Sequence, residues 1–159
     1  MSVSKDDFRS ALGRFASGVT IVTTRDASGK LHGITVSAFC SVSLEPPLVL
    51  VCIEKTTGSH FAFQESSSFV VNLLAADQQY LSDRFASHLP DKFDTVKCRL
   101  GIDDLPVLDD TLATLECRLK TSHDAGDHTI FVGQIERTTI RDDEKPLIYF
   151  HGNYREIKD

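Results

Sequence analysis

The chain has 159 residues, with 17 basic and 23 acidic side chains and a net charge of −6 at pH 7. This length indicates one domain over residues 1–159, and the acidic balance disfavours nucleic acid or an anionic membrane as a partner. We expect a cytoplasmic protein, because no apolar run approaches the length of a membrane span and no signal peptide precedes the first amphipathic segment.

The first half predicts one helix and then mostly strands. Ser4 stands at the cap position of an amphipathic pattern, which predicts a helix over residues 5–16 that ends before Gly18. A polar loop at residues 54–59 opens a short helix that carries Phe61 and Phe63. β-Branched and apolar segments predict strands over residues 19–25, 31–39, 48–53 and 68–74. The third of these strands is apolar on both faces, so we expect both faces to be buried.

The second half begins with a helix and returns to strands. Asp77 is placed to cap a helix over residues 78–87, with Leu81 and Phe85 on its inner stripe. Residues 88–101 are polar and irregular, and long enough for a functional loop. The remaining strands are predicted as an edge strand over 105–108, a long hairpin that pairs 111–121 with 129–140, and a last strand over 146–151.

These elements predict the fold class. About eight strands stand against two or three short helices, and strands and helices do not alternate. We therefore expect a mainly β protein that forms a closed or nearly closed antiparallel barrel with a few short peripheral helices.

The most unusual stretch runs from Gly33 to Leu50. It combines apolar alternation with short hydroxyl side chains and a Pro-Pro pair at residues 46–47. Small residues let a flat group approach the backbone, and hydroxyls and amide N–H groups bind phosphate or ring heteroatoms. We interpret the stretch as the wall of a cofactor site. Two surface strands joined by a proline turn are the alternative interpretation.

Two further segments offer groups for an anionic ligand. Residues 55–59 place a lysine, hydroxyls and amide donors before a short helix, which predicts a phosphate cradle, although an exposed helix cap has the same composition. Arg84 points away from the predicted inner stripe of its helix. It is free either for a surface salt bridge or for an anionic ligand.

Other kinds of site are disfavoured. His123, Asp124, Asp127 and His128 crowd one hairpin tip, but we expect no metal site there because no distant ligand completes the set. The four cysteines form no C-x-x-C pair and lie among apolar neighbours, which indicates buried, reduced thiols. No G-x-S-x-G elbow and no Rossmann glycine motif is present in the sequence.

Six blocks in their order resemble the short-chain flavin reductase family. Its members are NAD(P)H:flavin oxidoreductases of the FMN-binding split β-barrel fold, of Greek-key type, and often serve as the reductase component of two-component flavin monooxygenases. The similarity covers nearly the whole chain. The blocks are FASGVTIVTT (15–24), HGITVSAFCSVSLEPPLVLVCI (32–53), VVNLL (70–74), LSDRFA (81–86), GDHTIFVGQIE (126–136) and PLIYFHGNYR (146–155).

The resemblance implies a flavin site and a nicotinamide site. In relatives an asparagine often stands where this chain has Ser37, so one flavin contact has a shorter donor here. Arg84 and Phe85 would close over the flavin. The flavin ring and ribityl chain would lie along Thr35, Val36, Ser37, Ala38, Phe39 and Ser41, and the flavin phosphate against Lys55, Thr56 and Ser59. The nicotinamide would be bound by Gly126, Asp127, His128 and Tyr154.

The same resemblance implies the activity. Hydride would pass from nicotinamide C4 to flavin N5, with FMN or FAD as the flavin and NADH or NADPH as the donor. No side chain is expected as acid, base or nucleophile, because alignment of two stacked rings is the main requirement. A homodimer and a monooxygenase partner are expected. The alternatives are a non-catalytic flavin-binding module on the same barrel and a flavin oxidase of small amines.

Overall fold

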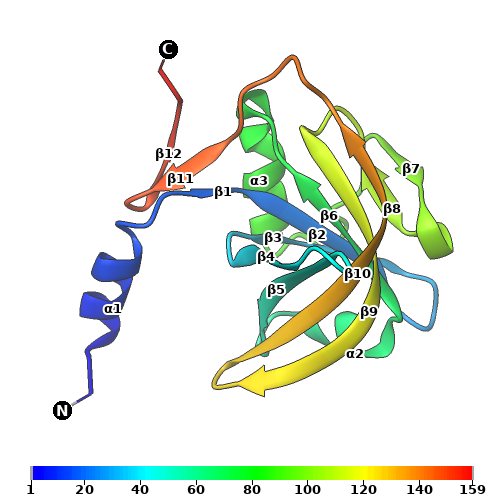
Figure 1. Cartoon of the computed structure of the whole chain (residues 1–159), viewed down its shortest axis with the longest axis horizontal. Helices are drawn as coiled ribbons and strands as arrows, with labels where there is room; N and C mark the ends of the chain where they lie inside the picture. Colours follow the sequence, from blue (N-terminus) through cyan, green and yellow to red (C-terminus); the bar gives the residue numbers. More distant parts are fainter. Residues whose placement is uncertain (1, 159) are drawn as a thin grey trace.

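The computed structural model describes residues 2–158, and its main feature is one antiparallel sheet of seven strands (Figure 1). The strands lie in the order β3, β2, β6, β9, β10, β5, β4. Their bounds are Leu31–Val36 (β3), Thr20–Arg25 (β2), Ser68–Leu73 (β6), Ala113–Ala125 (β9), His128–Ile140 (β10), Leu48–Glu54 (β5) and Phe39–Ser43 (β4).

The two edge strands of this sheet follow each other in the chain. Only Ser37 and Ala38 lie between the end of β3 and the start of β4, so the sheet must curl until its edges approach. Because β3 and β4 are not paired, the barrel keeps a seam at this corner. The prediction of a mainly β, antiparallel split barrel is confirmed.

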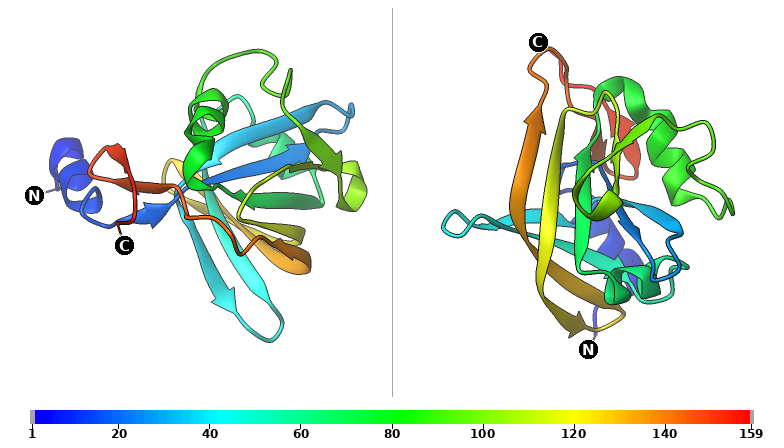
Figure 2. Two further views of the ribbon diagram at one scale, coloured as in Figure 1. Left: turned by 90° about the horizontal axis from the view of Figure 1, so that it is seen from above. Right: turned by 90° about the vertical axis from the view of Figure 1, so that its right-hand side faces the viewer.

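Smaller elements surround the barrel (Figure 2). The helices are α1 (Lys5–Leu12), α2 (His60–Glu65) and α3 (Gln79–Ala86), with 3-10 turns η1 (Ala76–Gln78) and η2 (Ile102–Asp104). Two further sheets consist of β1 (Ser17–Gly18), β11 (Ile148–Phe150) and β12 (Asn153–Arg155), and of β7 (Cys98–Leu100) and β8 (Pro106–Leu108). No helix in the described part of the chain is long and apolar enough to cross a membrane.

The barrel interior is filled by branched and aromatic side chains. Val22, Val51, Phe69 and Phe131 are at most 2% exposed and belong to one apolar cluster. Phe69 lies against the backbone of Gly133, where an added Cβ would come within 2.5 Å of the ring. A glycine in the middle of β10 therefore lets a phenylalanine of β6 fill the core.

Both longer helices differ at one end from the prediction. α1 ends at Leu12 rather than Ala16, because Ser17 has to reach the register that pairs it with Tyr149 of β11. α3 begins after a 3-10 turn, and its cap is not Asp77. The buried Gln78 accepts a hydrogen bond from the Ala75 N–H at 3.0 Å instead.

Predictions for three strand segments, one loop and one cysteine also need correction. The strand expected over 31–39 breaks at the seam, because the chain leaves one edge of the sheet for the other. β5 is buried on alternate residues only. Cys40 on the neighbouring edge strand is exposed, so the prediction that all four thiols are buried is wrong. Residues 98–100 of the expected loop form β7. The long hairpin closes in a two-residue turn after β9, where Gly126 has a φ of +63°.

Candidate functional site

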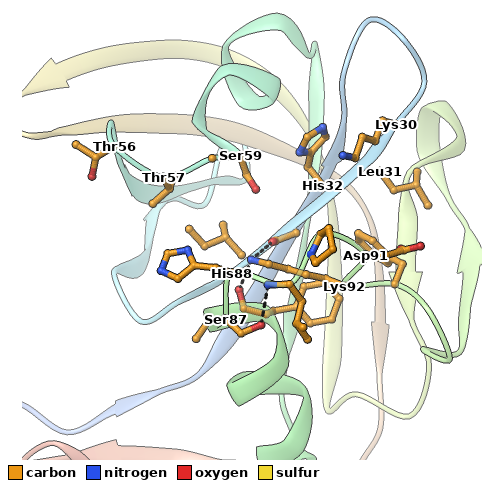
Figure 3. A pocket seen from close by; sticks show the side chains of 18 residues that line it. Lys30, Leu31, His32, Thr56, Thr57, Ser59, Ser87, His88, Asp91 and Lys92 are labelled. Carbon is orange, nitrogen blue, oxygen red and sulfur yellow. Dashed lines mark hydrogen bonds between the residues drawn. The ribbon is translucent and has the colours of Figure 1, made fainter.

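A cavity of about 680 Å³ lies between three segments. Residues 30–34 belong to β3 and the turn before it, residues 56–59 to the loop after β5, and residues 85–93 to the end of α3 and the loop that follows (Figure 3). Among the polar side chains of the lining, hydroxyl groups and bases predominate, with one carboxylate, Asp91. The basic side chains are Lys30, His32, His88 and Lys92, and the hydroxyls are Thr56, Thr57, Ser59 and Ser87.

The predicted phosphate cradle lies only partly in this cavity. Thr56 and Ser59 line it, as a cradle requires. Lys55 points to the tip of the β9–β10 hairpin instead, where its ammonium lies 3.4 Å from Asp124. α2 is only six residues long, so the dipole of a long helix does not contribute to this loop.

Arg84 and Phe85 make contacts within the chain that fix one wall of the cavity. The Arg84 guanidinium donates hydrogen bonds to the backbone carbonyls of Lys92 (2.6 Å), Asp91 (3.1 Å) and Asp94 (2.7 Å). Phe85 is fully buried and packs edge-to-face on Phe93, with ring centroids 5.0 Å apart. Both side chains are therefore engaged within the chain, and their role over the flavin stays a prediction.

His32 is a cavity residue that the sequence analysis missed. Its ring lies 2.8 Å from the Asp26 carboxylate. Hydrogen bonds from Ser28 and His32 hold the pKa of Asp26 well below its usual range, so the carboxylate stays ionised and orients the imidazole. The one sequence signal was a polar side chain inside a strand that otherwise reads as apolar.

The predicted ring-binding segment is divided by the seam. The Thr35 hydroxyl donates to the Ser82 carbonyl at 2.6 Å, and the Val36 side chain belongs to the core, so Val36 has only its backbone to offer a ligand. Ser37 and Phe39 line a second cavity of about 210 Å³, which is separate from the larger one. Ala38 is exposed at the corner.

The corner nevertheless keeps backbone donors. No hydrogen bond from the amide N–H of Ser37 or Ala38 is formed within residues 2–158. Ser41, farther along β4, is exposed as well. Exposed amide donors beside short side chains are the groups that bind ring heteroatoms, which is what the sequence predicted for this stretch.

The hairpin turn adjoins the loop that lines the larger cavity. The Lys55 N–H donates to the Asp127 carbonyl at 2.9 Å, and His128 pairs with Glu54 in the strand register. The His128 Nδ1 lies 2.7 Å from the Asp127 carboxylate, and this contact lowers the pKa of Asp127. The imidazole is therefore held by its Nδ1–H and presents Nε2 outward.

A buried histidine supports the same turn. His60 Nε2 lies 2.9 Å from the Thr129 hydroxyl, which donates its proton to Asp124 at 3.1 Å. Because the hydroxyl has only one proton, His60 must be the donor in the first contact. The chain of contacts from His60 to Asp124 continues to Lys55, so α2 and the hairpin tip are linked by polar groups that are buried at His60 and Thr129 and exposed at Asp124 and Lys55.

Tyr154 does not join the predicted nicotinamide residues. Its hydroxyl bonds to Ser82 at 2.7 Å and to Asp83 at 3.0 Å, both in α3. β12, which carries Tyr154, and the tip of the β9–β10 hairpin lie at opposite ends of the molecule (Figures 1 and 2). Within this chain Tyr154 packs on α3, and its role beside the nicotinamide stays a prediction. Nor do three metal-ligating side chains come together anywhere in residues 2–158.

Together the fold and the site define a split-barrel protein whose cavity suits a phosphorylated ligand. Residues 12–158 match the family model of the flavin reductase like domain. The chain belongs to this family, and the resemblance seen in its sequence is confirmed.

Two relatives and one solved structure are especially similar. The chain is 44% identical over 147 residues to the FMN reductase (NADH) SmoA of Agrobacterium fabrum, across 92% of this chain and 83% of that protein. It is 42% identical over 154 residues to HsaB, a flavin-dependent monooxygenase reductase subunit of Rhodococcus jostii, across 95% of this chain and 77% of that one. The NADH:FAD oxidoreductase SgcE6 of Streptomyces globisporus C-1027, solved in complex with NAD and FAD fragments, has a TM-score of 0.91 at 34% identity and covers 99% of this chain and 97% of its own.

Proposed function

We propose that this protein is an NADH-dependent flavin reductase that supplies reduced flavin to a partner monooxygenase. The observation that carries the proposal is the bond between the Gly126–His128 turn and the loop that lines the larger cavity, through Lys55 N–H and Asp127 O. Hydride transfer needs two ligands side by side, and here the two predicted subsites are neighbours. The names of the relatives point to the same activity.

The residues present fit a flavin. Hydroxyls and bases in the cavity supply donors for a phosphate, and the unbonded amides at Ser37 and Ala38 supply donors for the polar edge of a flat ring. A bound flavin would supply the hydride acceptor. Donors at the ring edge stabilise negative charge that develops on reduction, so the corner has an electrostatic role as well as a binding role.

The side chains near the turn have an orienting role. Asp127 fixes the His128 imidazole through Nδ1–H, which leaves Nε2 as an acceptor for the carboxamide of a nicotinamide. His128 then sets the position of the donor ring and transfers no proton. His128→Ala is expected to raise the KM for NADH with little loss of kcat, whereas an unchanged KM would contradict the orienting role.

The test of the function is aerobic oxidation of NADH and of NADPH by the purified chain, with FMN, FAD or riboflavin added or omitted. We expect flavin-dependent consumption of NADH at a higher kcat/KM than NADPH. If the protein takes up flavin but oxidises neither nucleotide, the non-catalytic flavin-binding module is the correct interpretation. Equal rates with and without flavin would contradict both.

Self-association is part of the proposal. No residue of α1 is buried, and Phe8 and Leu12 are 59% and 54% exposed on a helix that stands apart from the barrel (Figure 1). Burial of this apolar face against a second copy explains its composition. Leu147, just before β11, is buried in the core of this chain and is not available to a second copy. Light scattering should give the mass of a dimer, and Phe8→Glu should give a monomer. Cytoplasmic location stays a prediction from the sequence.

A further inference from the structure

Lys92 is a cation that the chain holds at the larger cavity. Its Nζ donates to the Phe85 carbonyl at 2.7 Å and lies 3.4 Å from the Gly33 carbonyl (Figure 3). The first carbonyl is in the last turn of α3, where the helix end carries partial negative charge. Both partners are neutral groups. An ammonium has three donors, so one donor and the full charge remain available to the cavity.

No carboxylate within residues 2–158 forms an ion pair with Lys92. The side chain is half-buried, and burial lowers its pKa. A charge held at a partly desolvated place without a counterion is costly, unless the site serves an anion.

Anchoring of the loop does not explain this lysine. Arg84 already binds the backbone carbonyls of Asp91, Lys92 and Asp94, so the loop is held without the Lys92 side chain. Lys55, the cation that the sequence offered for a phosphate, points to Asp124 and does not line the cavity. Lys92 lies across the cavity from the Thr56 and Ser59 hydroxyls (Figure 3).

We propose that Lys92 is the cation by which this site selects phosphorylated flavins, FMN and FAD, over riboflavin. The inference rests on the proposed function and deepens it, because it assigns the charge recognition of the flavin to a residue outside the predicted cradle. The contact is a charge-assisted hydrogen bond from the ammonium to a phosphate oxygen, with the Thr56 and Ser59 hydroxyls as further donors. Lys92→Met keeps an apolar stem of similar length and removes the charge together with its hydrogen-bond donors.

The experiment measures equilibrium binding of FMN and riboflavin by flavin fluorescence, and the KM for each flavin with NADH. For Lys92→Met we expect the Kd and KM for FMN to rise about tenfold to a hundredfold, while those for riboflavin change less than about threefold. Lys92→Arg should restore much of the discrimination. Lys97→Met, an exposed lysine of the same loop outside the cavity, is the matched control and should behave as the unaltered chain.

Any of the following results for Lys92→Met would contradict the inference. A parallel rise for FMN and riboflavin would show that Lys92 only supports the wall, and no change for either would show that it binds nothing. A rise in the KM for NADH with riboflavin as acceptor would assign Lys92 to the dinucleotide phosphates instead. If the unaltered chain oxidises no NADH, the proposed function fails, whereas the fluorescence titration still tests Lys92.

Discussion

The larger cavity has two walls that are built differently. One wall is β3 together with the loop after β5, and its backbone is fixed by strand pairing on β2 and on β10. The other wall is the loop after α3, residues 87–93, which belongs to no strand. The guanidinium of Arg84, which donates to three backbone carbonyls in or directly after this loop, holds it in place. The position of the first wall follows from the alternation of residues along its strands. The position of the second wall depends on contacts between side chains and the backbone of another segment.

The largest effect on the cavity is expected when the hydrogen bonds that hold the loop after α3 are removed. Arg84→Met removes three charge-assisted hydrogen bonds and should lower the free energy of opening of residues 88–97 by about 3 kcal/mol. Hydrogen exchange in that segment should accelerate roughly a hundredfold, while the β6 and β9 amides keep their protection. The KM for flavin should rise as the wall loosens.

Arg137→Met is the control for this prediction, since Arg137 is exposed and distant from the cavity lining. Unchanged exchange in residues 88–97 of the Arg84 variant, combined with a raised KM for flavin, would show that Arg84 contacts the ligand as the sequence analysis expected. The experiment therefore separates support of the wall from direct binding.

The difference between the walls also explains what could be predicted from sequence. The strands and the antiparallel barrel follow from β-branched alternation. Thr56 and Ser59, which the sequence predicted for a phosphate, line the cavity. The orientations of Lys55 and Arg84 depend on partners 69 and 8 residues away, Asp124 and Lys92. No local pattern encodes such contacts.

The seam is a second feature that a local sequence pattern could not predict. Residues 31–39 alternate as one strand would, yet the chain changes sheet edge at Ser37 because β4 pairs with β5. Tyr154 was grouped with the hairpin turn by resemblance alone, whereas the fold places it on α3 through Ser82. The position of the seam and the position of Tyr154 are both decided by contacts with residues distant in the sequence.

A second prediction concerns the hydrogen bonds that support the strand wall through the β9–β10 hairpin. Thr129→Val keeps the shape of the side chain but removes the hydroxyl between His60 and Asp124, so a buried imidazole N–H loses its acceptor. We expect a loss of about 1–2 kcal/mol in the free energy of unfolding, measured by urea denaturation. Thr129→Ser retains the hydroxyl and should lose less than the valine variant. Equal losses in both variants would mean that the methyl group, and not the hydrogen-bond chain, stabilises the hairpin tip.

The smallest effect is expected at Asp26, which orients His32 on the strand wall. Hydrogen bonds hold the folded pKa of Asp26 below the ordinary value, so the unfolded chain takes up the proton first as the solution becomes acidic. Asp26 therefore stabilises the fold above the ordinary aspartate pKa of about 4, and this contribution is lost as the pH falls from there through the folded pKa. In urea denaturation at a series of pH values, the unaltered chain should be more stable than Asp26→Asn near neutral pH, and the gap should narrow below about pH 4. A gap that stays constant with pH would show that Asp26 acts as a neutral hydrogen-bond acceptor, in which case its charge does not orient His32.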